Sequence, residues 1–262
     1  MESLSKGASQ AAIIAVGSEL LTPDKLDTNS LFLTEELNSV GFKVTQKIVV
    51  GDDAHDLDSA FHYSCHVAPL VLVTGGLGPT EDDLTRDVIA SALGRSLQID
   101  KVLLEDIRKK FSERGLRMPE VNRRQAEVPQ GAEILSNEHG TAPGLILGNE
   151  TMTTVLLPGP PRELQPMFRQ YVANRLRNIN AGQRVYRRVL RTTGETESFV
   201  DECVKPVYRE WVSRSVPIQT TILASLGQID LHLSVVSSDE FEAKTILDDA
   251  VSELRERLGV LV

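Results

Sequence analysis

Short apolar runs alternate along the first half of the chain with segments whose apolar residues recur every three or four positions. The runs over 11–16, 44–50 and 70–74 each predict a buried strand. Helical spacing predicts helices over 28–40 and 53–66 between them. This alternation indicates a mostly parallel sheet with right-handed crossovers and helices on both faces.

The same pattern continues beyond the third strand. It predicts helices over 80–93 and 100–113, a short polar helix over 119–126, strands over 132–135, 144–147 and 153–157, and a helix from 160 or 161 to about 176. A polar stretch over 178–183 then marks a domain boundary. We therefore expect a first domain over residues 1–178 and a second over 184–262.

The second domain is predicted to be a small β-α-β-β-α module. Its expected elements are a strand over 187–193, a helix over 195–204, a hairpin of 219–224 with 228–236, and a final helix over 239–258. In that last helix we expect one buried stripe, formed by Phe241, Ile246, Val251, Leu254 and Leu258. The predicted fold class is therefore α/β: a three-layer, mostly parallel sheet with a second, smaller α+β domain.

Composition limits the kind of protein. The 262 residues are 41% hydrophobic and 25% charged, values typical of a soluble globular chain with room for two domains. No apolar run approaches the roughly 20 residues of a membrane span, and residues 1–10 lack the apolar core of a signal peptide. Cys65 and Cys203 lie far apart, which indicates neither a disulfide nor a zinc site. We expect a cytoplasmic protein without a membrane partner.

Charge argues against nucleic acid as a partner. The net charge is −9, and residues 1–170 carry 16 Lys and Arg against 24 Asp and Glu. Phosphate backbones need a basic footprint, which this domain lacks. The second domain has a cluster of arginines in a strand-like segment: Arg184, Arg187, Arg188 and Arg191. That spacing favours a solvated sheet edge.

The most informative chemistry follows the third strand, where three glycines stand close together. Gly75, Gly76 and Gly78 let backbone N–H groups approach an anion without obstruction by a Cβ atom. Four acidic residues come next: Glu81, Asp82, Asp83 and Asp87. Crowded carboxylates suit a phosphate when a cation lies between them. The sequence therefore predicts a metal-assisted site for a phosphorylated ligand.

Three successive strands end in a glycine with a carboxylate nearby. The pairs are Gly17 with Glu19, Gly51 with Asp52, and Gly75 with Asp82. Because parallel strands end at one rim of a sheet, we expect these carboxylates to converge. A structural interpretation stays open: Thr80 with Asp83 also forms a capping box, and a first helical turn favours acidic residues.

Seven motifs follow one another along the first domain. They are Gly-Ser-Glu-Leu-Leu at 17–21, Asp-Thr-Asn-Ser at 27–30, Val-Gly-Asp-Asp at 50–53, Thr-Gly-Gly-Leu-Gly-Pro-Thr-Glu-Asp-Asp-Leu-Thr at 74–85, Asn-Arg-Arg-Gln-Ala at 122–126, Gly-Thr-Ala-Pro-Gly at 140–144 and Leu-Pro-Gly-Pro-Pro-Arg-Glu-Leu at 157–164. In this order they resemble the family of competence/damage-inducible protein A (CinA). The resemblance implies a molybdopterin-binding fold of the MoaB and Mog type, followed by a KH-like domain.

This chain departs from the family pattern at two places. Thr22-Pro23 stands where many members have a glycine, and residues 171–262 contain no Gly-x-x-Gly clamp, so RNA binding is not inherited. Full-length members often continue into a nicotinamide mononucleotide amidohydrolase domain. We expect that deamidase activity to be absent here.

The resemblance implies a homodimer that hydrolyses ADP-ribose, a nucleotide-sugar diphosphate, to AMP and ribose 5-phosphate with a divalent metal (Mg, Mn or Co). The implied catalytic residues are Asp82, Asp83 and Glu19, and the implied metal ligands are Asp82, Asp83 and Asp52. Substrate binding is assigned to Gly75, Gly76, Leu77, Gly78, Thr80, Asp27, Asn29, Asn122, Gln125 and Gly159. Two alternatives stay open: a non-catalytic molybdopterin- or nucleotide-binding module, and a regulatory partner in competence or DNA damage.

Overall fold

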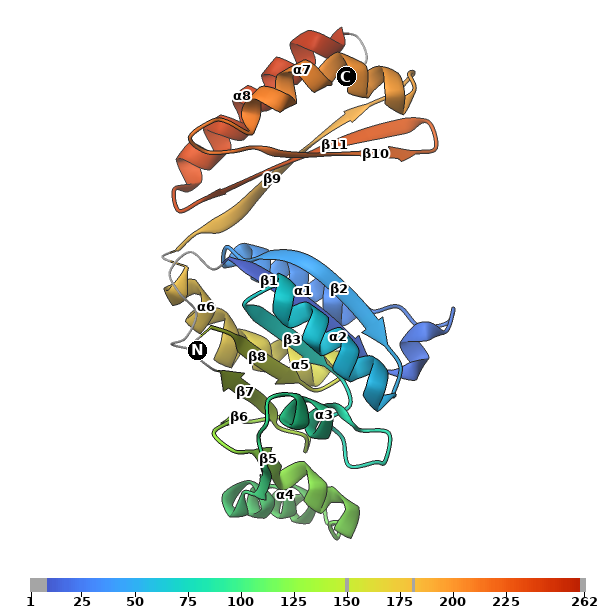
Figure 1. The fold of residues 1–262 in the computed structure, drawn as a ribbon, viewed down its shortest axis with the longest axis vertical. Helices are drawn as coiled ribbons and strands as arrows, with labels where there is room; N and C mark the ends of the chain where they lie inside the picture. Colours follow the sequence, from blue (N-terminus) through green and yellow to red (C-terminus); the bar gives the residue numbers. More distant parts are fainter. Residues whose placement is uncertain (1–8, 149–150, 181, 260–262) are drawn as a thin grey trace. The chain divides into compact units, whose positions relative to one another are not determined.

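The structure, a computed structural model, describes residues 9–148, 151–180 and 182–259. These residues fall into two compact units, with the boundary after Asn180 (Figure 1).

The first unit is built on a six-stranded sheet of order β2-β1-β3-β8-β7-β6. The strands are β1 (Gln10–Val16), β2 (Lys43–Val50), β3 (Leu70–Thr74), β6 (Glu133–Leu135), β7 (Gly144–Gly148) and β8 (Thr153–Leu157). β2, β1, β3 and β8 pair in parallel, whereas β7 and β6 run antiparallel. The predicted, mostly parallel sheet is confirmed.

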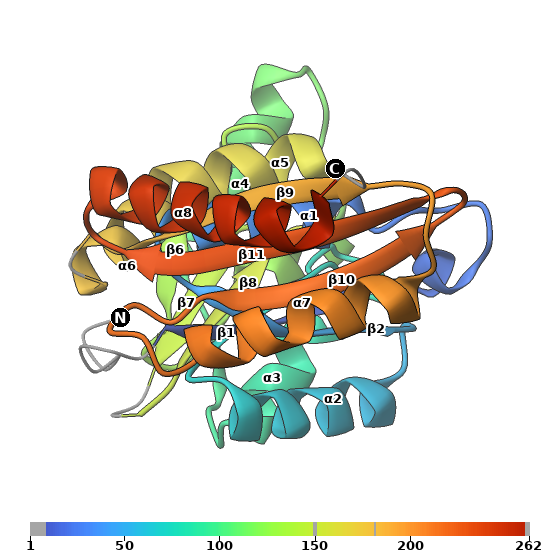
Figure 2. The same cartoon turned by 90° about the horizontal axis from the view of Figure 1, so that it is seen from above.

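Helices cover both faces of this sheet and give three layers (Figure 2). The helices are α1 (Thr28–Ser39), α2 (Ala54–Val67), α3 (Thr85–Ala92), α5 (Pro161–Met167), the π-helical turn η3 (Phe168–Ala173) and α6 (Asn174–Ile179). On one face α2 packs against β1, β2, β3 and α3, and buries Leu57 and Phe61. α1 and η3 meet through an edge-on contact of the Phe32 and Phe168 rings, with centroids 6.2 Å apart. Burial of these apolar faces is the main stabilising contribution.

A smaller group of elements lies beyond the main sheet, around α4 (Figure 1). It comprises the antiparallel pair β4 (Leu97–Ile99) and β5 (Glu127–Pro129), α4 (Lys101–Glu113) and the 3₁₀ helix η2 (Glu120–Ala126). α4 begins as predicted, with the Asp100 side chain accepting from the Leu103 amide at 2.8 Å. The pair β4–β5 was not predicted, because three residues are too few to show a strand's period of two.

The second unit is a three-stranded antiparallel sheet of order β10-β11-β9, with both helices on one face (Figure 1). Its elements are β9 (Arg184–Thr192), α7 (Glu197–Trp211), β10 (Gln219–Ser225), β11 (Gln228–Ser237) and α8 (Glu240–Leu258). The inward residues of β11 (Ile229, Leu231, Leu233 and Val235) and Trp211 form its core. The predicted order of elements is confirmed.

Two details of the second unit correct the sequence analysis. α7 runs through Pro206 to Trp211 instead of ending near residue 204, because Val200, Val204 and Trp211 all bury their side chains on one face. In α8 the buried stripe is Ala243, Leu247, Ala250, Leu254 and Leu258. Phe241, predicted to be buried, lies 81% exposed, because it is out of phase with this helical spacing. No helix in the described ranges is long and apolar enough to cross a membrane.

Candidate functional site

A cleft of about 470 Å³ opens in the first unit, beside the carboxyl ends of β1, β2 and β3. Ten of the fourteen residues predicted for the site line it: Glu19, Asp52, Gly75, Gly76, Leu77, Gly78, Asp82, Asp83, Gln125 and Gly159. The remaining predicted residues lie elsewhere. Thr80 and Asn122 do not line the cleft, and Asp27 and Asn29 line a neighbouring compartment.

The glycine loop after β3 has a backbone that only glycine adopts easily. Gly75 and Gly76 have φ angles of +92° and +63°. The buried Thr85 fixes this shape: its hydroxyl donates to the Gly75 carbonyl at 2.8 Å, and its amide donates to the Gly76 carbonyl at 3.1 Å. A Cβ atom on Gly76 would overlap the Thr85 hydroxyl oxygen. Thr85 therefore holds the loop in this conformation through two hydrogen bonds, a role that the sequence analysis did not assign to it.

Only part of this loop offers free amides to a ligand. The Gly75 amide donates to the Leu157 carbonyl at 3.0 Å, and the Gly78 amide donates to Asp83 Oδ1 at 2.8 Å. The amides of Gly76 and Leu77 have no hydrogen-bond partner among the residues that the structure describes. Two adjacent free amides in a positive-φ turn form an anion-binding concavity. The sequence analysis assigned all four residues over 75–78 to substrate binding, but only the amides of Gly76 and Leu77 are free to bind a phosphate.

Asp83 closes the loop rather than starting a helix. Its Oδ1 accepts from Gly78, and its Oδ2 accepts from the Thr80 amide at 2.9 Å and from the Thr80 hydroxyl at 2.6 Å. α3 therefore begins at Thr85, and the predicted helix start at Thr80 is wrong. Both Asp83 oxygens are engaged by these bonds, and the Thr80 hydroxyl that was assigned to a phosphate is used here as well.

Asp82 has a different environment. Its side chain is exposed and lines the cleft. Hydrogen bonding from the Thr80 side chain, and then from its own backbone amide, lowers the pKa of Asp82 below its ordinary value. Since one hydroxyl carries one proton, and the 2.6 Å bond of Thr80 goes to Asp83, the backbone amide is the hydrogen bond that still lowers the pKa of Asp82. Asp82 is left ionised and open to a ligand.

The ends of β1 and β2 are joined beside the cleft. The Ser18 amide donates to Asp52 Oδ2 at 2.8 Å, and the Asp52 amide donates to the Ser18 hydroxyl at 3.0 Å. This reciprocal pair holds Asp52 next to Glu19. The second compartment, of about 660 Å³, begins at Glu19 and Gly159, which line both spaces. Asn29 there donates its amide to the Gly159 carbonyl at 2.7 Å.

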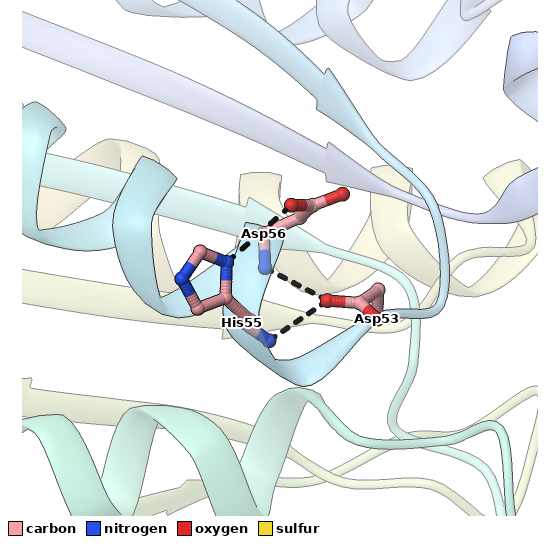
Figure 3. A group of neighbouring side chains, drawn as sticks. All are labelled: Asp53, His55 and Asp56. Carbon is pink, nitrogen blue, oxygen red and sulfur yellow. Dashed lines mark hydrogen bonds and ion pairs between the residues drawn. The ribbon is translucent and has the colours of Figure 1, made fainter.

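The predicted metal ligands do not form a ready-made centre. Among the described residues, the group of three ligating side chains with atoms within 4.8 Å of one another is Asp53, His55 and Asp56 (Figure 3). Asp53 Oδ1 accepts from the His55 and Asp56 amides at 2.9 Å, so this group is explained as the N-cap of α2.

The carboxylates in the cleft are of the type that binds a divalent cation, but among the described residues no three of them have ligating atoms within 4.8 Å of one another. Glu19, Asp52 and Asp82 supply hard carboxylate oxygens from three separate segments around one space. Asp83, whose oxygens already accept three hydrogen bonds, is the weakest member of the predicted set.

Residues from η2 support the site indirectly. Asn122 Nδ2 donates to Gln125 Oε1 at 3.0 Å, so Asn122 orients the buried Gln125 that lines the cleft. Arg124 donates to the Thr80 carbonyl at 2.8 Å and to Asp87 at 3.1 Å. These bonds fasten the loop over 78–83 to the first turn of α3.

Four charged or titratable residues of the lining were missed: Arg114, His139, Arg162 and Glu163. His139 and Arg114 lie in segments that carry no strand-end signal, and only the folded chain brings them to the cleft. Arg162 and Glu163 stand inside the motif over 157–164, of which the sequence analysis selects Gly159 alone. For Arg162 and Glu163, this motif was the feature of the sequence that could have identified them.

Comparison with known proteins agrees with this architecture. Residues 12–178 match the family described as "Probable molybdopterin binding domain". The chain is 42% identical over 249 residues to a CinA-like protein from Solibacter usitatus, and 40% identical over 252 residues to one from Koribacter versatilis. It covers 59% and 60% of those proteins, and 95% of this chain takes part in each match.

Among solved structures, the protein CinA from Thermoplasma acidophilum is 34% identical, with a TM-score of 0.58, over 62% of this chain and 95% of that one. The predicted molybdopterin-binding fold of the first domain is confirmed by the family match. The chain therefore belongs to the family of CinA-like proteins, with a molybdopterin-binding type of domain over residues 12–178.

Proposed function

We propose that the first unit hydrolyses the diphosphate linkage of a nucleotide sugar, with ADP-ribose as substrate and AMP and ribose 5-phosphate as products. The observation that carries this proposal is the shared lining of one cleft by two free amides and three strand-end carboxylates. The amides suit phosphate oxygens, and the carboxylates suit a cation that shields them.

The reaction breaks one bridging P–O bond. A water oxygen bonds to one phosphorus, the bridging oxygen leaves with the other phosphate, and the two protons of the water are released or shared between the products. A divalent cation, when bound, neutralises charge on the phosphoryl oxygens. We assign the orientation of the water to Asp82 and Glu19, and the binding of a phosphate oxygen to the amides of Gly76 and Leu77, because all four residues line the cleft.

The adjoining compartment gives room for the rest of a dinucleotide-sized substrate. Glu19 and Gly159 line both spaces, and Asp27 and Asn29 supply polar groups in the second. We assign a ribose or the base edge to this compartment.

The metal requirement tests the proposal. Turnover of ADP-ribose should disappear in excess EDTA and return on addition of Mg²⁺, Mn²⁺ or Co²⁺. Full turnover in EDTA would show that the carboxylates do not act through a cation.

A second function is favoured by the family description itself. Residues 12–178 match a probable molybdopterin-binding domain, and a binding module of that kind would need the anion-binding loop but no oriented water. Tight binding of a pterin phosphate, together with no release of AMP from ADP-ribose at any metal concentration, would support that alternative.

A further inference from the structure

The loop between β6 and β7, residues 136–143, forms one wall of the cleft. It does not carry the pattern of a glycine followed by a carboxylate that marks the ends of β1, β2 and β3. Four consecutive residues of it, His139 to Ala142, line the cleft. A segment that contributes so much of a binding surface must hold one shape to be useful.

Asn137 holds this loop from inside. Its side chain is 3% exposed. Nδ2 donates to the Ala142 carbonyl and to Glu163 Oε2, both at 2.8 Å, and Oδ1 accepts from the His139 amide at 3.0 Å. Both amide protons and the amide oxygen are therefore satisfied, which is the condition under which a buried polar side chain fixes one conformation.

Two neighbouring elements fasten the loop from either side. Glu163, 8% exposed in the first turn of α5, lies so close to Gly140 that a Cβ atom there would overlap its carboxylate. Lys110 of α4 donates to the Asn137 carbonyl at 2.6 Å and to the Gly140 carbonyl at 3.3 Å. Arg162 precedes Glu163, and Arg114 is the C-cap of α4, so the fastened elements carry the two arginines of the cleft.

We propose that Lys110, Asn137 and Glu163 are positioning residues that hold His139 and the loop backbone against an anionic group of the ligand. The carboxylates at the strand ends repel a phosphate unless a cation intervenes, whereas Arg114 and Arg162 attract one directly. The ligand class is thus a substrate with a second phosphate, held away from the carboxylates. This inference rests on the proposed function for the identity of the substrate.

The test is equilibrium binding of ADP-ribose, measured by calorimetry with Mg²⁺ present, beside steady-state kinetics. Asn137→Asp places a carboxylate against Glu163 and the Ala142 carbonyl, and should raise both Kd and KM about tenfold or more while kcat changes less than about threefold. Glu163→Gln keeps an acceptor for Asn137, so its increase in Kd should be smaller than that of Asn137→Asp. When the two substitutions are combined, the introduced glutamine amide can donate to the introduced aspartate, and part of the lost affinity should return.

Lys109→Met is the matched control for Lys110→Met, because the Lys109 side chain is 70% exposed and its ion pair with Glu113 lies within α4. Lys110→Met should weaken binding and Lys109→Met should not. The inference is overturned if Asn137→Asp binds ADP-ribose like the wild type, or if adding the Glu163 substitution gives no recovery in a double variant that remains folded. If Asn137→Asp and Lys110→Met weaken ADP-ribose binding as expected but the wild type does not hydrolyse ADP-ribose, the hydrolase proposal is refuted and the positioning role of these residues is supported.

Discussion

Asp82 and Asp83 are adjacent in sequence but have different surroundings. Asp83 accepts three hydrogen bonds from its own loop, whereas Asp82 is exposed in the cleft and keeps a lowered pKa. A lowered pKa means that Asp82 stays ionised further into acid than an ordinary aspartate, so a step that needs its charge is lost only as the pH falls below that value.

The substitution Asp82→Asn should separate function from stability. Removing one charged group that acts in the reaction should lower kcat on the order of 100-fold. The melting temperature should stay at the wild-type value, because the side-chain bonds that close the loop are made by Asp83. Kinetics and a thermal melt of the same preparation check both halves.

Glu81→Gln is the control, since Glu81 is exposed and lies outside the cleft lining. It should leave kcat within about twofold, as expected for a surface change. If Asp82→Asn and Glu81→Gln lose activity to the same degree, the total negative charge of the loop matters and not the position of the Asp82 carboxylate.

Among the structural elements, the glycine loop and the segment after β8 respond differently to an added methyl group. Gly76→Ala meets a positive φ and the Thr85 hydroxyl, so it should lower the melting temperature together with activity. Gly159→Ala meets only the Gly75 Cα at 3.5 Å, an ordinary contact.

Gly159→Ala is therefore the sharper probe of the cleft. Gly159 lines both compartments, so its added methyl group should raise KM for ADP-ribose roughly tenfold, with the melting temperature unchanged. An unchanged KM would indicate that the substrate does not pass over Gly159.

The contact of α7 with α8 gives a prediction for the second unit. The buried Trp211 donates its indole N–H to Glu253 Oε2 at 2.9 Å, and Arg214 donates to the same carboxylate at 2.9 and 3.0 Å. Glu253→Ala leaves that indole N–H unpaired and should destabilise the unit by about 1–3 kcal/mol. Trp211 is the chain's one tryptophan, so denaturant unfolding followed by its fluorescence reports the change. The exposed Glu256 provides the control, Glu256→Ala.

The hydrogen bonds to Glu253 also predict how the stability of the second unit changes with pH. Burial alone would raise the pKa of Glu253, but the hydrogen bonds from Arg214 and Trp211 outweigh burial and lower it. Its contribution is therefore present above the ordinary value of 4.5 and is lost as the pH falls through the lower folded value. The advantage of wild type over Glu253→Ala should therefore shrink in that acid range, and an advantage that does not change there would contradict the assignment.

At the scale of the whole molecule, the arrangement of elements was predictable and the arrangement of side chains was less so. The strands over 11–16 and 70–74 follow from apolar runs that a buried parallel sheet demands. The start of α3 could not be predicted, because Thr80 and Asp83 have the spacing of a capping box whether a helix or a tight loop follows. Arg114 and His139 reach the cleft only through tertiary packing of α4 and the 136–143 loop.

The number of chains that associate in solution is also open to a direct test. The family resemblance implies a homodimer, and sedimentation should then give about twice the 28.8 kDa of one chain. The apolar stripe of α8 is not free for such a contact, because it is buried in the second unit's own core. A mass of one chain across micromolar concentrations would contradict the dimer.

Product analysis of ADP-ribose incubated with the purified protein and Mg²⁺ tests the proposed hydrolysis directly. AMP and ribose 5-phosphate should appear in equal amounts with the wild type, and their formation should fall on the order of 100-fold with Asp82→Asn. Absence of AMP from the wild-type reaction, or equal rates for the two proteins, would contradict the assignment of this cleft as a diphosphate-hydrolysing site.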